Sequence, residues 1–427
     1  MNRFSRNKKI IFTCVLILLA LLFVEAGAFT MYCIVRKRIF PRSKYESDIS
    51  HISNNVNITG FADKQIRNSE MRFGNVVEVI HPYLGFVQDP KRNNNISDFG
   101  FPGDVNPINS RTKNRLIVGI FGGSFAEGTY RHGRDSLINV LKATGKEIVV
   151  VNLAMGGYKQ PQQLLALTYL LSLGAKFDLV INIDGFNEVA LPSSENISKN
   201  VFPIYPRGWY FRVAAASDQK AVMQIARLVA LDQKREKWAG LFEKTRLYYS
   251  VAFCLLWKAV DRLLESKKIM ALLALKHDRK VANAYVVTGP QYSFLNDDVL
   301  YGYLATIWKH SSFQMHLICQ ANNIRYYHFL QPNQYVEASK PMGEEERVIA
   351  INDNHIYRLG VIKGYPFLRQ YGAELVRVGV KFHDLTMIFA EIEDVLYNDD
   401  CCHVNAEGYR IIVSTIGDLI TEDMLSR

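Results

Sequence analysis

Short apolar runs recur along the chain and alternate with longer amphipathic segments, and this alternation predicts parallel strands joined by helices. The runs are nearly continuous in apolar residues, as expected for strands that are buried on both faces of a sheet. The helical patterns between the runs place helices on both faces of the sheet, in a flavodoxin-like strand order. The predicted fold class is therefore α/β with a parallel five-stranded sheet, whose strands we expect at 116–121, 148–152, 179–183, 323–330 and 378–386.

The chain between the third and fourth predicted strands is much longer than one crossover requires. Residues 191–281 contain helical patterns at 219–241 and 247–276, and the second pattern has a broad apolar face. We predict a packed helical insertion between these two strands. A cap over the substrate crevice and a helix that contacts a membrane are the alternatives.

The N-terminal segment is apolar from Ile10 to Val35, with Glu25 as its charged exception. At about 1.5 Å per residue, this stretch can cross a bilayer core of about 30 Å. A cleaved signal peptide is the alternative, with Ala26-Gly27-Ala28 resembling a cleavage site. Because the apolar run resumes after these residues, we favour an uncleaved, single-pass transmembrane helix. Basic residues on both sides of the segment leave its orientation open.

The pattern along the chain predicts three parts. Residues 1–36 form the membrane anchor. Residues 37–110 form a polar lead, rich in Asn and Ser, whose apolar stretch at 81–87 packs on the domain that follows. Residues 111–427 form that domain and include the helical insertion at 191–281.

A serine flanked by glycines follows the first predicted strand directly, in the run Gly122-Gly123-Ser124. Such a strand delivers the serine into a tight turn. The hydroxyl then stands at the carboxyl end of a buried strand, where open α/β sheets place their ligand crevices.

Three further segments carry polar groups suited to the same chemistry. The glycine turn containing Gly157 follows the second predicted strand, and Asn187 follows the third. Near the C-terminus, Asp400 and His403 are three residues apart and can meet in one turn.

In this order, the four segments resemble the SGNH (GDSL-like) hydrolase family, with Ser124, Gly157, Asn187 and His403 at the positions that name it. The resemblance covers roughly residues 112–190 and 282–425 and implies a three-layer fold. The Gly-Asp-Ser of the family reads Gly122-Gly123-Ser124 here, which leaves the nucleophile in place and puts membership of the lipase-like branch in doubt.

The chemistry of acyl transfer explains these residue types. A serine hydroxyl needs a base to take its proton, which is the role of His403, and the imidazole needs a carboxylate to hold its tautomer, which we assign to Asp400. By resemblance, the oxyanion that develops on the ester is stabilised by the N–H groups of Ser124 and Gly157 and by the amide of Asn187.

Each assignment has a structural alternative. The glycines around Gly157 can form an ordinary turn, and Asn187 and Asp400 can cap helices. His403 follows Cys401 and Cys402, and the three side chains are potential metal ligands. Because consecutive residues rarely converge on one tetrahedral ion, we expect neither a metal nor a cofactor.

The composition narrows the function classes. The 427 residues are 48% hydrophobic and 22% charged, which suits a large folded core. The net charge of +10 comes from lysines and arginines that are mostly scattered, and no zinc-finger spacing or RNP-like motif is present, so a nucleic-acid partner is disfavoured. The six cysteines form no recognisable disulfide framework and leave the compartment open.

We therefore expect a membrane-anchored serine esterase that hydrolyses an O-acyl ester through an acyl-enzyme. The resemblance implies a catalytic domain outside the cytoplasm and a substrate such as an acetylated cell-surface carbohydrate. An O-acyltransferase of envelope polysaccharide is the nearest alternative, because it shares the first half-reaction. A catalytically silent SGNH domain that binds or assembles polysaccharide-synthesis components is the alternative from another class.

Overall fold

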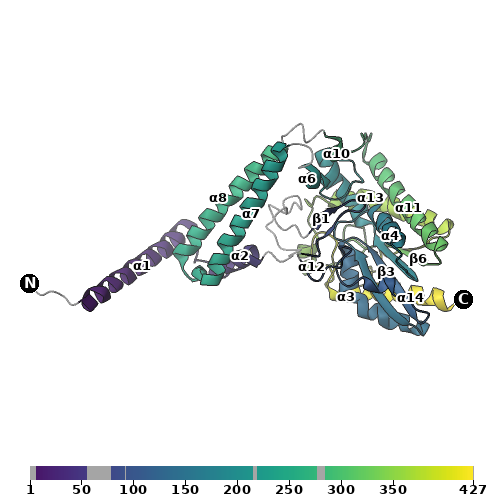
Figure 1. The fold of residues 1–427 in the computed structure, drawn as a ribbon, viewed down its shortest axis with the longest axis horizontal. Helices are drawn as coiled ribbons and strands as arrows, with labels where there is room; N and C mark the ends of the chain where they lie inside the picture. The colour runs from purple at the N-terminus through teal and green to yellow at the C-terminus, as the bar shows by residue number, and fades with distance from the viewer. Residues whose placement is uncertain (1–5, 55–77, 92, 215–218, 277–283, 427) are drawn as a thin grey trace, which may run out of the picture. The chain divides into compact units, whose positions relative to one another are not determined.

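The computed structural model describes residues 6–54, 78–91, 93–214, 219–276 and 284–426, and Figure 1 labels the elements that they form. These residues fall into two compact units. A helical unit contains the described parts of 1–75 and 218–281, and an α/β unit contains those of 76–217 and 282–427.

The helical unit is built from helices that are distant in the sequence. Its helices are α1 (Arg6–Arg36), α2 (Arg42–Asn54), α7 (Gln219–Thr245) and α8 (Val251–Lys276). In α1, the stretch Ile11–Arg36 is 26 residues long and apolar enough to cross a membrane, and no residue of its most apolar 18-residue window is buried by other parts of the chain. This finding fits the predicted anchor and equally fits a signal sequence.

The core of the helical unit divides the chain differently from our prediction. Ile49 of α2 is buried against Phe242 of α7 and Trp257 of α8, so the first part of the predicted lead belongs with these helices. The rest of the lead, from residue 78 onward, lies in the α/β unit. An apolar face on α2 that needs α7 and α8 to cover it accounts for this split.

Glu25, the charged residue within the apolar stretch of α1, has partners in this unit. The carboxylate of Glu25 accepts hydrogen bonds from Ser250 Oγ at 2.6 Å, from the Ala252 N–H at 3.2 Å and from the Val251 N–H. These donors belong to the first turn of α8, where backbone N–H groups lack partners within the helix. A carboxylate at a helix N-terminus is also favoured by the helix dipole.

The α/β unit contains the predicted five-stranded parallel sheet, in the order β4-β3-β5-β6-β7. Numbered along the sheet, this is the flavodoxin-like order 2-1-3-4-5. The strands are β3 (Arg115–Gly122), β4 (Glu147–Ala154), β5 (Leu179–Asp184), β6 (Arg325–Leu330) and β7 (Lys381–Asp384). The last strand was predicted too long at both ends, and the bounds of the other four strands agree with the prediction to within two residues.

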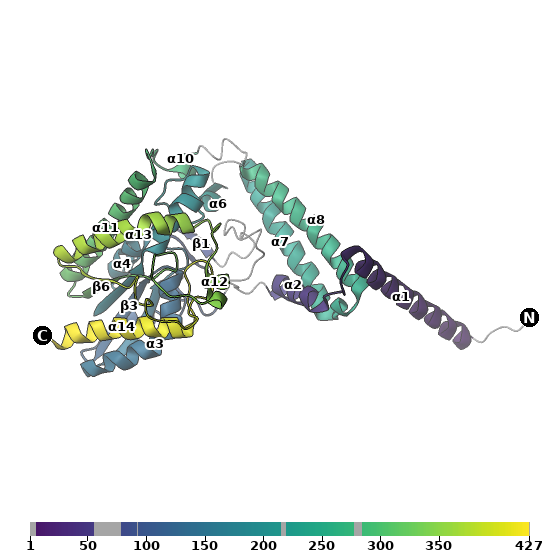
Figure 2. The ribbon, with the colours of Figure 1, turned by 180° about the vertical axis from the view of Figure 1, so that it is seen from behind.

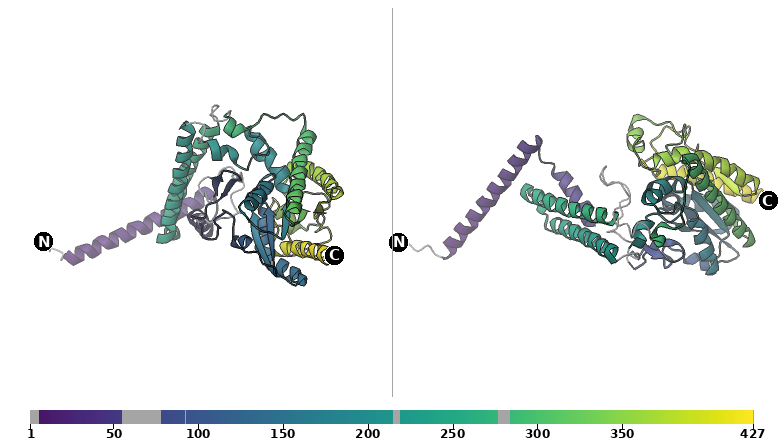
Figure 3. Two further views of the ribbon diagram at one scale, coloured as in Figure 1. Left: turned by 45° about the vertical axis from the view of Figure 1, so that its right-hand side comes forward. Right: turned by 90° about the horizontal axis from the view of Figure 1, so that it is seen from above.

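Alternate residues of β3 point to opposite faces of the sheet, because side chains in a strand have a period of two. Val118 and Ile120 pack with α3 (Ser124–Leu141) and α14 (Ala406–Leu425). Ile117 and Phe121 pack into the larger core on the other face. That face is covered by α4 (Gln162–Ser172), α5 (Phe186–Leu191), α11 (Asp297–Ala321) and α13 (Arg358–Arg377). Figure 2 shows α3 beside α14 on one side of the strands, and Figure 3 gives two further views.

Smaller elements complete the α/β unit. A two-stranded antiparallel hairpin of β1 (Glu78–His81) and β2 (Gly85–Gln88) buries Leu84 and Phe86 in the larger core. Three short helices lie in the connections, namely α6 (Trp209–Ala214), α10 (Tyr285–Thr288) and α12 (Glu344–Ala350). In sequence, α6, α7, α8, α10 and α11 all fall between β5 and β6.

Candidate active site

Ser124 is the first residue of α3 and follows β3 through two glycines. Gly122 has φ +145°, and a Cβ built on it would lie 2.1 Å from the carbonyl oxygen of Ile183. Only glycine fits such a conformation at such a contact. The tight turn places the Ser124 hydroxyl at the carboxyl end of β3, as the sequence predicted, and also at the N-terminus of α3.

His403 lies in a short loop just before α14 and reaches the serine. Its Nε2 is 2.9 Å from Ser124 Oγ, although the two residues are 279 positions apart in the sequence. The loop is closed at its base by a bridge between Tyr397 and Val404 and by a hydrogen bond of 3.1 Å from the Asn398 N–H to the His403 carbonyl. The predicted pair of nucleophile and base is therefore brought together.

The carboxylate that meets the histidine is that of Asp399. Its Oδ2 is 2.5 Å from His403 Nδ1. Its Oδ1 accepts hydrogen bonds from the N–H groups of Cys401, Cys402 and His403 at 3.0, 2.9 and 3.0 Å. Burial alone would raise the pKa of Asp399, but the charge of His403 and these hydrogen bonds lower it to about 2.

The assignment of Asp400 to this role is corrected by the geometry. Asp400 Oδ2 accepts a hydrogen bond of 2.8 Å from Asn352 Nδ2, and Oδ1 is 3.8 Å from His355 Nε2. The prediction assumed that a spacing of three residues forms one regular turn. The segment is instead a closed loop folded around Asp399 Oδ1, and the last helix starts only at Ala406.

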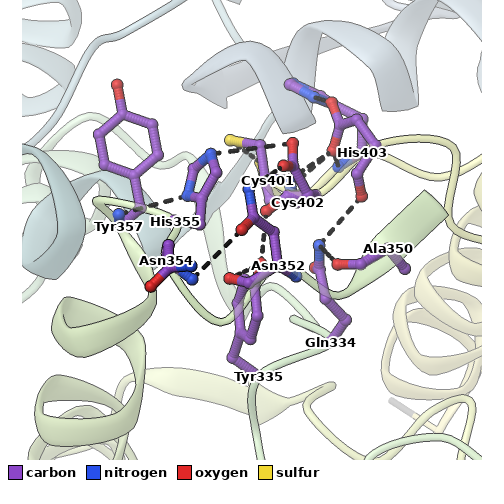
Figure 4. Close-up of polar contacts among 12 residues, drawn as sticks. Gln334, Tyr335, Ala350, Asn352, Asn354, His355, Tyr357, Cys401, Cys402 and His403 are labelled. Carbon is purple, nitrogen blue, oxygen red and sulfur yellow. Dashed lines mark hydrogen bonds and ion pairs between the residues drawn. The ribbon is translucent and has the colours of Figure 1, made fainter. Parts of the chain in front are cut away.

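A segment that follows β6 holds this loop in place, as Figure 4 shows in part. Asn333 Nδ2 donates to the carbonyl of Cys401 at 3.0 Å, and Gln334 Nε2 donates to that of Asp399 at 3.1 Å. Tyr335 Oη donates to the carbonyl of Asp400 at 2.9 Å. The side chains of this segment fix three consecutive carbonyl groups of the loop that carries His403.

The predicted oxyanion donors converge beside the serine. A Cβ built on Gly156 would lie 4.0 Å from Ser124 Cβ, so the glycine turn after β4 is next to the serine side chain. Asn187 Nδ2 donates to the carbonyl of Tyr158 at 2.7 Å, which leaves the second N–H of the amide for another acceptor. Among the described residues, the N–H groups of Ser124 and Gly157 have no hydrogen-bond acceptor.

The position that departs from the family pattern is explained by the same contacts. A Cβ on Gly123 would lie 2.2 Å from Asn187 Nδ2 and 3.2 Å from the carbonyl oxygen of Tyr158. A larger residue at this position would displace the amide of Asn187. Asn187 is the second residue of α5 and does not cap it, because Gly185 occupies the N-cap position.

His403 combines opposing electrostatic influences. Burial lowers its pKa, but the negative charges that Cys402 and Asp399 can carry raise it well above 6.5. The ligand atoms of Cys401, Cys402 and His403 lie within 4.8 Å of one another, as a metal site requires. Both ring nitrogens of His403, however, already contact Ser124 and Asp399.

Two charged residues near the site were missed in the sequence. Glu127 lies one turn after Ser124 on α3 and pairs with Arg131 at 2.5 Å. Burial raises the pKa of Glu127, and the charges of Arg131 and His403 oppose this effect. Arg207 lies over Gly157. Neither residue stands in a recognisable motif, so only the fold reveals its position.

The fold and these contacts define a class: α/β proteins in which a serine, a histidine and an aspartate are hydrogen bonded in series at the carboxyl edge of a parallel sheet. Such a series can activate a hydroxyl for attack on a carbonyl.

No protein-family model and no curated protein matches the chain. A similar solved structure is that of a GDSL-like lipase from Bacteroides thetaiotaomicron VPI-5482. It is 14% identical, and the alignment covers 73% of this chain and 89% of that chain with a TM-score of 0.33.

Proposed function

We propose that the chain is a serine ester hydrolase of SGNH type that acts through an acyl-enzyme on an O-acyl ester. The observation that carries the proposal is the continuous hydrogen-bonded series from Ser124 Oγ through His403 to Asp399. The order of the four sequence motifs supports it independently.

In the first half-reaction, His403 Nε2 takes the proton of Ser124 while Oγ attacks the ester carbonyl. Asp399 accepts a hydrogen bond from the Nδ1–H of the ring and, by remaining ionised, stabilises the imidazolium that forms. The developing oxyanion lies toward the Gly157 turn and the free amide N–H of Asn187, and each such donor supplies about 3 to 4 kcal/mol of transition-state stabilisation. The alcohol leaves with the proton from His403, and water then attacks the acyl-enzyme by the reverse sequence.

We further propose that α1 stays on the mature chain as a single-pass anchor with the catalytic unit outside the cytoplasm. Cleavage after Ala28 would remove Glu25 and leave the first turn of α8 without the carboxylate that accepts its hydrogen bonds. Within this location, we propose an acetylated cell-surface carbohydrate as the leading substrate class, following the resemblance.

Labelling by a fluorophosphonate tests the function on the detergent-solubilised full chain, because this reagent reacts with activated serines. Wild type should label and hydrolyse a short-chain acetate ester, and Ser124→Ala should do neither. His403→Ala should lose nearly as much, because nucleophile and base act as one unit. Ser172→Ala, at an exposed position of α4, is the matched control and should behave like wild type. Labelling that persists in Ser124→Ala would contradict the proposal. Labelling without hydrolysis would instead favour acyl transfer.

A further inference from the structure

Arg207 lies directly on the glycine that we place in the oxyanion hole. A Cβ built on Gly157 would lie 2.5 Å from Arg207 Cδ and 3.2 Å from Nη1. Gly157 has φ +81°, so both its conformation and this contact require glycine. The guanidinium group is therefore next to the position at which the ester carbonyl is attacked.

Among the described residues, the guanidinium group of Arg207 has a partner on one side only. Arg207 Nε is 3.2 Å from Glu195 Oε2, and the carboxylate of Glu195 is also contacted by the Tyr357 hydroxyl. Glu195 is only 3% exposed, whereas one third of the Arg207 side chain, 33%, is exposed. The backbone at Arg207 is fixed as well, because its carbonyl accepts a hydrogen bond of 3.1 Å from Arg212 Nε. The arginine is thus oriented before any ligand binds.

The two Nη nitrogens of Arg207 are available to a ligand. Within the described part of the chain, neither has a hydrogen bond or ion pair. A guanidinium has five N–H donors, of which Glu195 accepts one. Arg207 and Cys401 also influence each other's ionisation, so the group lies near both the Gly157 turn and the loop that carries His403.

We propose that Arg207 is a specificity residue that binds an anionic group of the substrate, a carboxylate or a phosphate, beside the ester that Ser124 attacks. This inference rests on the proposed esterase function and narrows its substrate class to esters of acidic molecules. A planar guanidinium suits these anions because two parallel N–H groups match two oxygens. The rigid contact with Glu195 reduces the entropy lost when the anion binds.

The test compares aryl acetates that differ in charge, using the full-length protein in detergent. The substrates are 4-acetoxybenzoate, 4-acetoxyphenyl phosphate and the neutral 4-acetoxybenzamide. In Arg207→Gln, the ratio of kcat/KM for an anionic ester to that for the neutral ester should fall by about tenfold to a hundredfold, the effect of one charge-assisted hydrogen bond. If this ratio falls more for 4-acetoxybenzoate, the site prefers a carboxylate, and if it falls more for 4-acetoxyphenyl phosphate, the site prefers a phosphate.

Arg115→Gln is the matched control. Arg115 also pairs with a glutamate, Glu147 at 3.0 Å, but it begins β3 at the opposite edge of the sheet. In Arg115→Gln, the ratio of kcat/KM for anionic to neutral esters should stay at the wild-type value. Arg207→Lys keeps the charge without the planar fork and should fall between wild type and Arg207→Gln. A measurement on wild type is independent of whether the variants fold: benzoate should protect Ser124 from fluorophosphonate at lower concentration than benzamide does.

The outcomes separate this inference from the proposed function. If the wild-type protein neither reacts with fluorophosphonate nor hydrolyses any of the esters, the proposed esterase function itself is refuted. Normal labelling and turnover with an unchanged ratio in Arg207→Gln, or equal protection by benzoate and benzamide, would overturn only the anionic subsite. An equal fall for neutral and anionic esters would also overturn it, because the arginine would then act on the oxyanion or on the Gly157 turn.

Discussion

Replacing Asp399 by asparagine should nearly abolish turnover, because the structure fixes how the new amide must lie. Asp399 Oδ1 accepts three backbone N–H groups, so the oxygen of an asparagine stays on that side and its NH₂ faces His403 Nδ1. The NH₂ then donates to Nδ1, which places the ring proton on Nε2. A protonated Nε2 cannot take the proton of Ser124.

The size of the effect follows from the alternative orientation of the amide. Turning the amide oxygen toward His403 would leave three N–H groups facing an NH₂, at a cost of about 1 kcal/mol or more for each lost hydrogen bond. About 3 kcal/mol in favour of the wrong tautomer removes roughly 100-fold of activity. Loss of the negative charge that stabilises the imidazolium adds to this, so we expect a fall in kcat of about 10³ to 10⁴, as in serine proteases.

Asp400→Asn is the neighbouring control. Its carboxylate contacts Asn352 and lies near His355 rather than His403, so kcat should stay within about tenfold of wild type, the effect of one altered hydrogen bond. Both variants would be assayed with a short-chain acetate ester, with thermal unfolding as a check that each is folded. A larger loss in Asp400→Asn than in Asp399→Asn, in two folded proteins, would refute the geometry argued above.

Three further results are expected. Because the protonated form of His403 is stabilised in the folded protein, kcat/KM should rise with pH through a midpoint above 6.5. Asp399→Asn should lower that midpoint, because it removes the negative charge that stabilises the protonated ring. A pH–rate profile from pH 5 to 9 measures both midpoints, and an unchanged midpoint in the variant would contradict the pairing of His403 with Asp399. Asn187→Ala should lower kcat by roughly 100- to 1,000-fold with little change in KM, and a loss confined to KM would exclude an oxyanion role. The full chain should stay in membranes after carbonate extraction, and the mass of the mature protein should include Glu25; a mature chain that starts after Ala28 would show a cleaved signal peptide instead.

The sheet was predictable from the sequence because its strands are buried on both faces. Such strands appear as apolar runs, and the glycines or polar residues at their ends mark where they stop. The prediction was weakest at the last strand, expected over 378–386 and observed as β7 over 381–384. Gly379 has φ +88°, so the chain is still in a turn at that position, and no local pattern separates the turn from the strand.

The division into units was not predictable in the same way. α2 carries few apolar residues, and its assignment depends on contacts of Ile49 with helices about 190 to 210 positions later in the chain. Local periodicity indicates that a helix exists and which face is apolar, but not which partner covers that face. The same limit applies to Glu25, which reads as a defect in an apolar segment until the first turn of α8 is placed beside it.

The spacing of motifs in the sequence identified some residues of the candidate site but not the aspartate that contacts His403. Ser124, Asn187 and His403 could be named from the sequence, because each follows a recognisable strand or precedes a recognisable helix. The choice between two adjacent aspartates could not, because it depends on a loop whose shape is set by Asn333 and its two neighbours, about 65 residues earlier. The residues that orient His403, and the arginine that we propose binds an anionic substrate group, therefore come from loops without a motif. Variation in those loops can change specificity while the serine and histidine stay fixed, so Arg207 is a more direct test of substrate class than the triad itself.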